Sequence, residues 1–128
     1  MILDSSAIVA IALDEPERAR FLRQIDAADL VAVAAPTLVE AGIVLSARTG
    51  EDATGLLDAL IGAADAVVLE FGPDHWREAI GAWARFGRGR HRAGLNFGDC
   101  LAYAAARISA QPLLAKGDDF QRTDLELV

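Results

Sequence analysis

The sequence predicts an α/β protein in which a parallel sheet is covered by helices on both faces. Short, bounded apolar runs of strand length alternate along the chain with longer segments of helical periodicity, which is the pattern of βαβ units. The chain has 128 residues, of which 53% are hydrophobic. This length suits one domain, and a chain of this size can bury enough apolar surface for a core without disulfides or metals. We therefore expect a single domain over residues 1–128.

Each predicted strand is a short apolar run that ends at a turn-forming or polar segment. The run "AVVLEF", for example, is rich in β-forming residues and stops at "GPD". The predicted strands are residues 1–3, 30–35, 66–71 and 111–115, with a last edge strand at 125–128. In a parallel sheet the ligand site lies outside the carboxyl ends of the strands, so residues that follow these runs are the first candidates for function.

The helices are predicted from their boundary residues and their apolar spacing. Serines can cap the first helix, and acidic residues occupy the first turn of the second. Pro36 and Gly50 mark the beginning and the end of the third, and Asn96 is the expected N-cap of the last. The predicted helices are residues 5–13, 14–28, 36–49, 51–64, 73–86 and 96–109.

Composition excludes several classes of protein. A single cysteine allows no disulfide within the chain, and no apolar stretch reaches the roughly 20 uninterrupted residues of a membrane span. Residues 1–13 are apolar but lack a basic leader and contain Asp4, which is not the pattern of a signal peptide. We therefore expect a cytoplasmic protein that does not bind membranes.

The net charge of −7 argues against non-specific binding to nucleic acid. The segment "RFGRGRHR" is the exception, because it concentrates arginines and contains no acid. Arg88, Arg90 and Arg92 in this segment are either part of a solvated loop or contacts to the phosphates of a nucleic acid.

Most acidic residues lie in the early turns of predicted helices, where the helix dipole favours them. Four places need a further explanation: Asp4, Glu40, Asp99 and the adjacent pair Asp118 and Asp119. Asp4 lies between two apolar runs, where it caps the next helix or faces a site; Ser5 and Ser6 are alternative caps. Glu40 is the single ionisable residue between Asp29 and Arg48, in a helix that is apolar nearly all round, and such helices are buried. The alternative for Glu40 is a narrow exposed stripe.

Asp99 falls at the third position of a helix capped by Asn96, where an acid is favourable in itself. Asp118 and Asp119 follow a predicted strand in "KGDD", a sequence that also suits a turn. Each acid has a local explanation, but all of them fall at strand ends or helix starts on one edge of the sheet. Carboxylates gathered there would repel one another or recruit a cation, and an all-oxygen ligand set favours Mg²⁺ or Mn²⁺. The one cysteine and the two histidines lack zinc spacing.

The sequence resembles the PIN-domain ribonucleases, in particular the VapC toxins of bacterial toxin–antitoxin pairs. The resemblance covers the whole chain and is carried by "MILDSSAIVAIALDEPE", "TLVEAGIVLSAR", "GRGRHRAGLNFGDCLAYAAA" and "PLLAKGDDFQRTDL". It implies a three-layer α/β/α sandwich with a central, mainly parallel sheet of four to five strands. It also implies a Mg²⁺- or Mn²⁺-dependent endoribonuclease that is inhibited by a VapB-type antitoxin and that commonly forms a homodimer.

By position, Asp4, Glu40 and Asp99 match the acidic residues of this family. The fourth family acid usually lies in a T-x-D-x-x-F pattern, where this chain has "AKGDDF". Aligning on Phe120 puts Gly117 at the acid, so either Asp118 or Asp119 takes that role. We expect Asp4 and Asp99 to hold the metal directly, and Glu40 to bind it through water or to orient the nucleophile. Ser6 and Asn96 are expected to support these ligands by hydrogen bonds.

Three other functions fit the sequence less well. An aspartate-based phosphohydrolase also has an Asp after its first strand but typically needs a second Asp two residues later, where this chain has Ser6. A phospho-receiver domain needs an Asp at the end of its third strand, where "VVLEFGPD" has none before the turn. A catalytically weak PIN-fold protein that acts mainly as a binding partner is opposed by Asp4, Glu40 and Asp99, although the unusual fourth position keeps it open.

Overall fold

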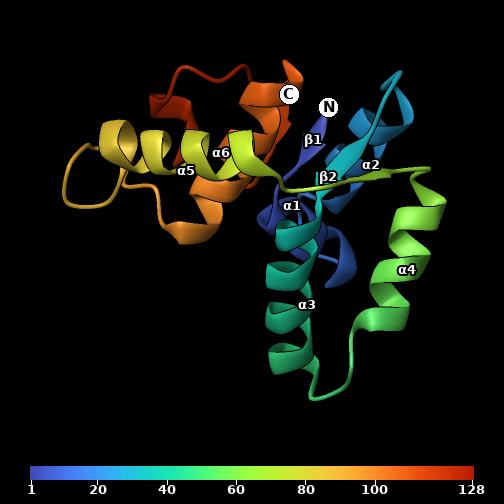
Figure 1. Cartoon of the computed structure of the whole chain (residues 1–128). Helices are drawn as coiled ribbons and strands as arrows, with labels where there is room; N and C mark the ends of the chain where they lie inside the picture. The colour runs from blue at the N-terminus through green and yellow to red at the C-terminus, as the bar shows by residue number, and fades with distance from the viewer.

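A computed structural model describes all residues, 1–128, and its centre is a four-stranded, fully parallel sheet. The order of the strands is β3-β2-β1-β4, so the chain starts in the middle of the sheet (Figure 1). The strands are β1 (Ile2–Leu3), β2 (Ala32–Ala34), β3 (Val67–Leu69) and β4 (Leu113–Leu114). The prediction of an α/β fold with a parallel sheet is confirmed.

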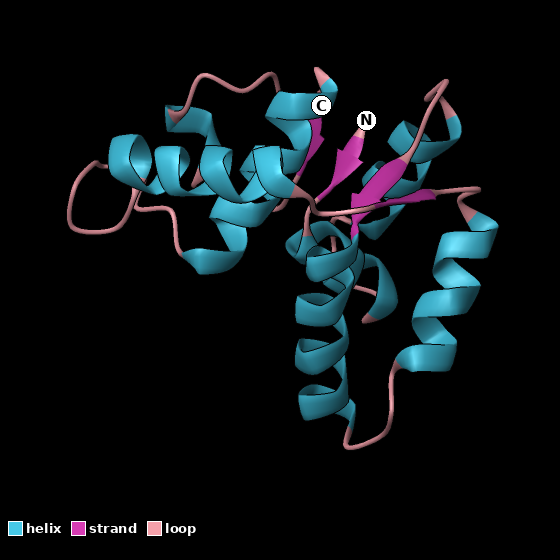
Figure 2. Ribbon diagram, in the orientation of Figure 1, coloured by secondary structure: helices cyan, strands magenta, loops and turns pink.

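The helices connect these strands and lie on both sides of the sheet (Figure 2). They are α1 (Ser5–Ala12), α2 (Arg18–Asp26), α3 (Ala35–Thr49), α4 (Thr54–Ala63), α5 (Pro73–Phe86) and α6 (Phe97–Ser109), with a 3₁₀ turn at Phe120–Arg122. Pro36 stands in the first turn of α3, and Gly50 ends the helix in the left-handed conformation, as the sequence predicts.

Successive side chains of the strands point to opposite faces of the sheet, and this divides the core into two buried layers. Leu3, Val33 and Leu114 pack on one side, against α1 to α4. Ile2, Ala32, Ala34 and Leu113 pack on the other, against α5 and α6. Because successive side chains of a strand point to opposite faces, β1, β2 and β4 each contribute to both layers. The result is the three-layer α/β/α arrangement.

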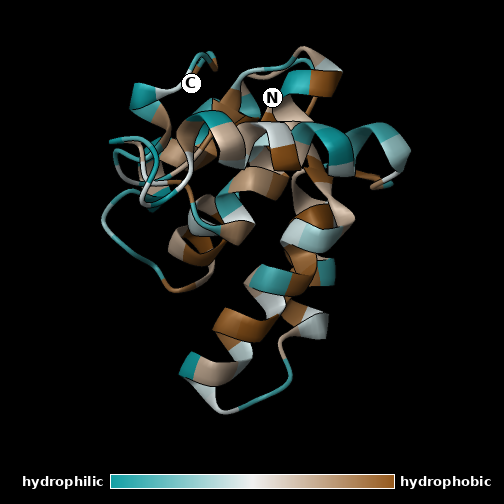
Figure 3. Ribbon diagram, turned by 60° about the vertical axis from the view of Figure 1, so that its left-hand side comes forward, coloured by the Kyte–Doolittle hydropathy of each residue, from teal (hydrophilic) through white to brown (hydrophobic).

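Three local expectations differ from the structure. Residues 14–17 form a turn in which Asp14 has φ = 55°, so α2 begins at Arg18 and not at residue 14. Residues 125–128 make only an isolated parallel bridge, between Leu113 and Leu127. The expectation that α3 is buried nearly all round is wrong, because Val39 and Ile43 are 62% and 65% exposed. Hydrophobic and hydrophilic segments alternate along the helices of the chain (Figure 3).

None of the helices combines the length and the apolar character that a membrane span requires.

Candidate active site

Asp4 directly follows β1 and is the N-cap of α1. Its Oδ2 accepts hydrogen bonds from the backbone N–H of Ser6, at 3.0 Å, and from the Ser6 hydroxyl. The residue is 3% exposed, and its Oδ1 is buried without any partner. Burial raises the pKa of Asp4, and the hydrogen bonds from Ser6 lower it, while the neighbouring charge of Glu40 raises it again. Capping therefore explains one oxygen of this carboxylate and leaves the other free for a ligand.

Ser6 joins the ends of two neighbouring strands. Its hydroxyl donates to Asp4 and accepts from the backbone N–H of Lys116, at 2.9 Å, just after β4. The Lys116 side chain in turn pairs with Glu15 at 2.8 Å and with Glu17 at 3.0 Å, in the turn between α1 and α2. These hydrogen bonds raise the pKa of Lys116. The start of the loop after β4 is thereby fixed relative to Asp4.

Glu40 lies on α3 and packs its carboxylate against the backbone of Gly98, near the start of α6. A Cβ at position 98 would lie 2.2 Å from Oε1 and 2.3 Å from Oε2 of Glu40. Oε2 is buried without a hydrogen-bond partner. Burial raises the pKa of Glu40, the Ser5 hydroxyl lowers it, and the charge of Asp99 raises it further. Glu40 is thus partly buried for a local reason, the absence of a side chain at Gly98, although α3 as a whole is not.

Asp99 is the third residue of α6 and forms a reciprocal cap with Asn96. The Asp99 N–H donates to Asn96 Oδ1 at 3.0 Å, and the Asn96 N–H donates to Asp99 Oδ2 at 2.8 Å. Burial raises the pKa of Asp99 to about 6; the hydrogen bond from Asn96 opposes the shift, and the charges of Asp4 and Asp119 add to it. The predicted N-cap is present, and it holds Asp99 within electrostatic reach of the other acids.

The structure separates the two acids of "GDD". The Asp118 carboxylate accepts a hydrogen bond from Gln121 Nε2 at 2.8 Å, within its own turn. The charge of Asp119 acts on Asp99. Asp4, Glu40, Asp99 and Asp119 are therefore linked electrostatically, while Asp118 is used locally. No group of three or more acidic, histidine or cysteine side chains is arranged to hold a metal ion as it stands.

The three arginines of the basic segment have different surroundings. The positive charge of Arg88 acts on Asp99 and lowers its pKa, which places Arg88 at the acids. The guanidinium of Arg90 lies 4.1 Å from the ring centre of Trp83 on α5. Arg92 is exposed, and its carbonyl accepts from Arg122 Nη1 at 2.9 Å. Of the three, Arg88 is the one that the structure brings to the candidate site.

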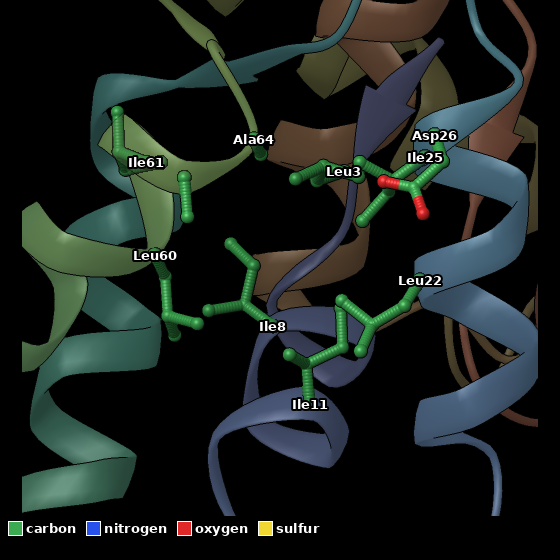
Figure 4. Close-up of a pocket in the computed structure, with 10 residues that line it drawn as sticks. Leu3, Ile8, Ile11, Leu22, Ile25, Asp26, Leu60, Ile61 and Ala64 are labelled. Atoms are coloured by element: carbon green, nitrogen blue, oxygen red, sulfur yellow. The ribbon is translucent and has the colours of Figure 1, made fainter.

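A separate apolar pocket lies between α1, α2 and α4 (Figure 4). Asp26 is its one polar residue, and none of the linked acids lines it. This pocket therefore has no part in the chemistry of the carboxylates.

Sequence reasoning missed Gly98 and the ion pairs of Lys116. The glycine directly before Asp99 was visible, but its contact with Glu40 joins residues 58 positions apart. Nothing local in the sequence signals such a contact.

Comparison with known proteins identifies close relatives of this arrangement. A sequence model described as "PIN domain" matches residues 1–126. Ribonuclease VapC30 of Mycobacterium tuberculosis is 41% identical over 128 residues, which cover 100% of this chain and 98% of that protein.

Two solved structures share the fold. The first is that of Mycobacterium tuberculosis VapC20, described as a sarcin-ricin loop cleaving toxin. It superposes with a TM-score of 0.80 at 18% identity, over 99% of this chain and 97% of that one. A toxin–antitoxin complex from Klebsiella pneumoniae gives a TM-score of 0.72 at 12% identity, over 99% and 95% of the two chains.

Proposed function

The chain belongs to the PIN-domain family and is a nuclease of the VapC ribonuclease type, and on this premise we propose that it cleaves RNA internally with a bound divalent metal ion. We further propose that it is the toxin of a toxin–antitoxin pair. The observation that carries the chemical part is Asp4, a carboxylate that is 3% exposed, at the end of β1, with one oxygen unpartnered. A buried carboxylate of this kind is costly unless a cation or a hydrogen-bond donor meets it.

The donor set fits Mg²⁺ or Mn²⁺. Asp4 and Glu40 each contribute a buried, unpartnered oxygen. Asp99 adds a carboxylate whose pKa is raised to about 6, with burial as the largest cause. All of these donors are hard oxygens. We assign Asp4 and Asp99 as direct ligands, Glu40 as a ligand through water or the group that orients the nucleophile, and Asp119 as the fourth acid. When bound, the ion supplies charge neutralisation at the phosphate and an activated water.

The protein's own groups prepare this site. Ser6 holds Oδ2 of Asp4 and Asn96 holds Oδ2 of Asp99, so each carboxylate is fixed through one oxygen. Fixed ligands need no reorganisation when the substrate binds. Arg88 supports the binding of RNA, because its charge lies at Asp99 and a phosphate must approach there. Arg90 and Arg92 extend this positive segment away from the acids.

The partners follow from the relatives and are proposals for this chain. The Klebsiella neighbour was solved as a toxin–antitoxin complex, which supports a VapB-type antitoxin that inhibits the enzyme. RNA is the proposed substrate, a cytoplasmic location follows from that substrate, and a homodimer is the proposed assembly.

The test is cleavage of RNA by the purified protein with Mg²⁺ or Mn²⁺ and with a chelator. We expect cleavage that needs the metal and leaves 5′-phosphate ends. Asp4→Asn should abolish cleavage and weaken binding of Mn²⁺ in calorimetry, while Asp58→Asn, at an exposed acid on α4, should change neither. Full activity of Asp4→Asn, or cleavage that survives the chelator, would contradict the proposal. Metal-dependent release of phosphate from small phosphomonoesters without RNA cleavage would favour an aspartate-based phosphohydrolase.

A further inference from the structure

Lys116 is the one lysine among the twelve basic residues of the chain. It lies in the loop that follows β4, three residues before Asp119. The proposed chemistry uses Asp119 and gives no role to this lysine. Its ammonium group nevertheless has close partners from another part of the chain, so the lysine needs an explanation of its own.

Two carboxylates of the turn between α1 and α2 meet the Lys116 ammonium. Glu15 Oε2 accepts a hydrogen bond from it at 2.8 Å, and Glu17 Oε2 lies 3.0 Å from it. Oε2 of Glu17 is buried, so the ammonium compensates a charge that is costly to bury alone. Glu15 also pairs with Arg48, near the end of α3, at 3.2 Å. We call Glu15, Glu17 and Lys116 the Lys116 cluster.

The Lys116 cluster is partly shielded from water. The side chains of Lys116, Glu15 and Glu17 are 37%, 23% and 29% exposed. An isolated pair on the surface contributes little, but a network of several charges with short distances holds its members in place. A lysine suits this position, because its compact ammonium has three donors that can serve two carboxylates at once. The cluster therefore joins the loop after β4 to the turn between α1 and α2.

The position of this loop depends on its two ends. Residues 117–119 are exposed, so they gain little support from packing. At the far end Phe120 is buried, with 4% exposure. At the near end the Lys116 N–H donates to Ser6 Oγ at 2.9 Å, and the ammonium enters the Lys116 cluster. Asp119 lies between these ends, so its place is set by Phe120 on one side and by Lys116 on the other.

We propose that Lys116 is a positioning residue, which acts through the Lys116 cluster to hold Asp119 at the carboxylates of the candidate site. The inference rests on the proposed function, because Asp119 is assigned there as the fourth acid. The two glutamates occupy the ammonium group, so Lys116 itself contacts neither the metal nor the RNA. The charge of Asp119 acts on Asp99 in the structure, and release of the loop would move that charge away.

The first test releases the Lys116 cluster from the side of its acids. Glu15→Gln combined with Glu17→Gln removes both carboxylates and keeps Lys116. The matched control, Asp58→Asn combined with Asp74→Asn, removes two charges at exposed positions on α4 and α5. Because the chain has one lysine, a lysine-specific endoprotease can cut it only after Lys116. We expect this cut to be at least about 10-fold faster in the cluster variant than in the wild type or the control, since local opening governs the rate.

The second test asks whether the Lys116 cluster acts through Asp119. In RNA cleavage with Mg²⁺, the cluster variant and Lys116→Met should each lose kcat at least about 10-fold, with KM changed less than about 2-fold. In an Asp119→Asn background the same substitutions should cause almost no further loss, because the group to be positioned is gone. Binding of Mn²⁺ in calorimetry, which requires no cleavage, should weaken equally in the cluster variant and in Asp119→Asn.

Circular dichroism checks that the variants are folded. Equal proteolysis of the cluster variant and the control would overturn the inference, and so would Mn²⁺ binding that the cluster variant leaves unchanged. A loss of kcat that adds in full to that of Asp119→Asn would show a merely structural role. Full activity of Asp119→Asn would leave the Lys116 cluster nothing to position and would also overturn the inference.

The same measurements separate this inference from the proposed function. A wild type that binds Mn²⁺ but does not cleave RNA would contradict the proposed function, while the proteolysis and the Mn²⁺ titrations would still decide for or against the role of Lys116. A wild type that binds no Mn²⁺ would overturn both.

Discussion

Gly98 is the position where a single added carbon should separate catalysis from folding. The substitution Gly98→Ala places a Cβ 2.2 Å from Oε1 and 2.5 Å from Cδ of Glu40, where ordinary contacts begin at 3.4 Å. The carboxylate must therefore move by about 1 Å. A displacement of this size in a catalytic group lowers the rate by about 100-fold.

The effect on stability should be much smaller. Overpacking lowers the free energy of unfolding by about 1–3 kcal/mol, but replacing glycine by alanine within a helix raises it by about 1 kcal/mol. The net loss of about 0–2 kcal/mol is well below the ~5–15 kcal/mol that holds a domain together. Gly98→Ala should therefore fold normally and fail in cleavage.

The assay measures single-turnover RNA cleavage, the binding of Mn²⁺ by calorimetry and the melting temperature. The matched control is Gly55→Ala, because Gly55 is also the second residue of its helix and a Cβ there meets nothing within 4 Å. The double variant Gly98→Ala with Glu40→Asp should recover part of the lost activity, since a shorter acid withdraws from the new methyl group. Unchanged cleavage by Gly98→Ala, or an equal loss in Gly55→Ala, would refute the reasoning.

Three further predictions concern the charged groups. Because burial raises the pKa of Asp99 to about 6 from 3.8, its proton stabilises the metal-free fold at low pH, and this stability is lost as the pH rises through about 6. Between about pH 4 and about pH 7, with most of the change below about pH 6, the wild type should therefore lose melting temperature relative to Asp99→Asn in calorimetry. Asp119→Asn should reduce cleavage at least about 10-fold and Asp118→Asn hardly at all; the reverse order would make Asp118 the fourth acid. Arg88→Gln should weaken RNA binding in titrations and flatten its salt dependence by about one unit of slope, more than Arg92→Gln does.

The fold could be predicted because its signals are local. Pro36, Gly50 and Asn96 mark helix ends through their own backbone preferences, and the structure uses each of them in that way. The turn at residues 14–17 was missed because acids and a proline also suit the first turn of a helix, and the left-handed Asp14 gives no warning in the sequence. The exposure of Val39 and Ile43 was missed because apolar residues on an outer face look the same as core residues until the packing is known.

The candidate site could be predicted only as a set of positions. Topology brings the ends of parallel strands together, which is why Asp4 and the loop after β4 could be placed at one edge. The choice between Asp118 and Asp119 depends on which carboxylate Gln121 occupies, and that is a side-chain contact. The exposure of Trp76, Ile80 and Trp83 on α5 could not be predicted either, since apolar residues at helical spacing are equally typical of a buried helix face.

For Asp4 and Asp99, the two explanations, a helix cap and the proposed metal ligand, are compatible with each other. Asp4 and Asp99 each commit Oδ2 to a cap, which fixes the plane of the carboxylate, and their remaining oxygen is directed elsewhere. The caps and the helix dipole lower the pKa values of both acids, yet burial outweighs them and both pKa values are raised. The fold therefore holds these carboxylates rigidly without providing enough positive charge to keep them ionised. A divalent cation would supply that charge, so the same burial that disfavours the ionised acids alone would favour the binding of the metal.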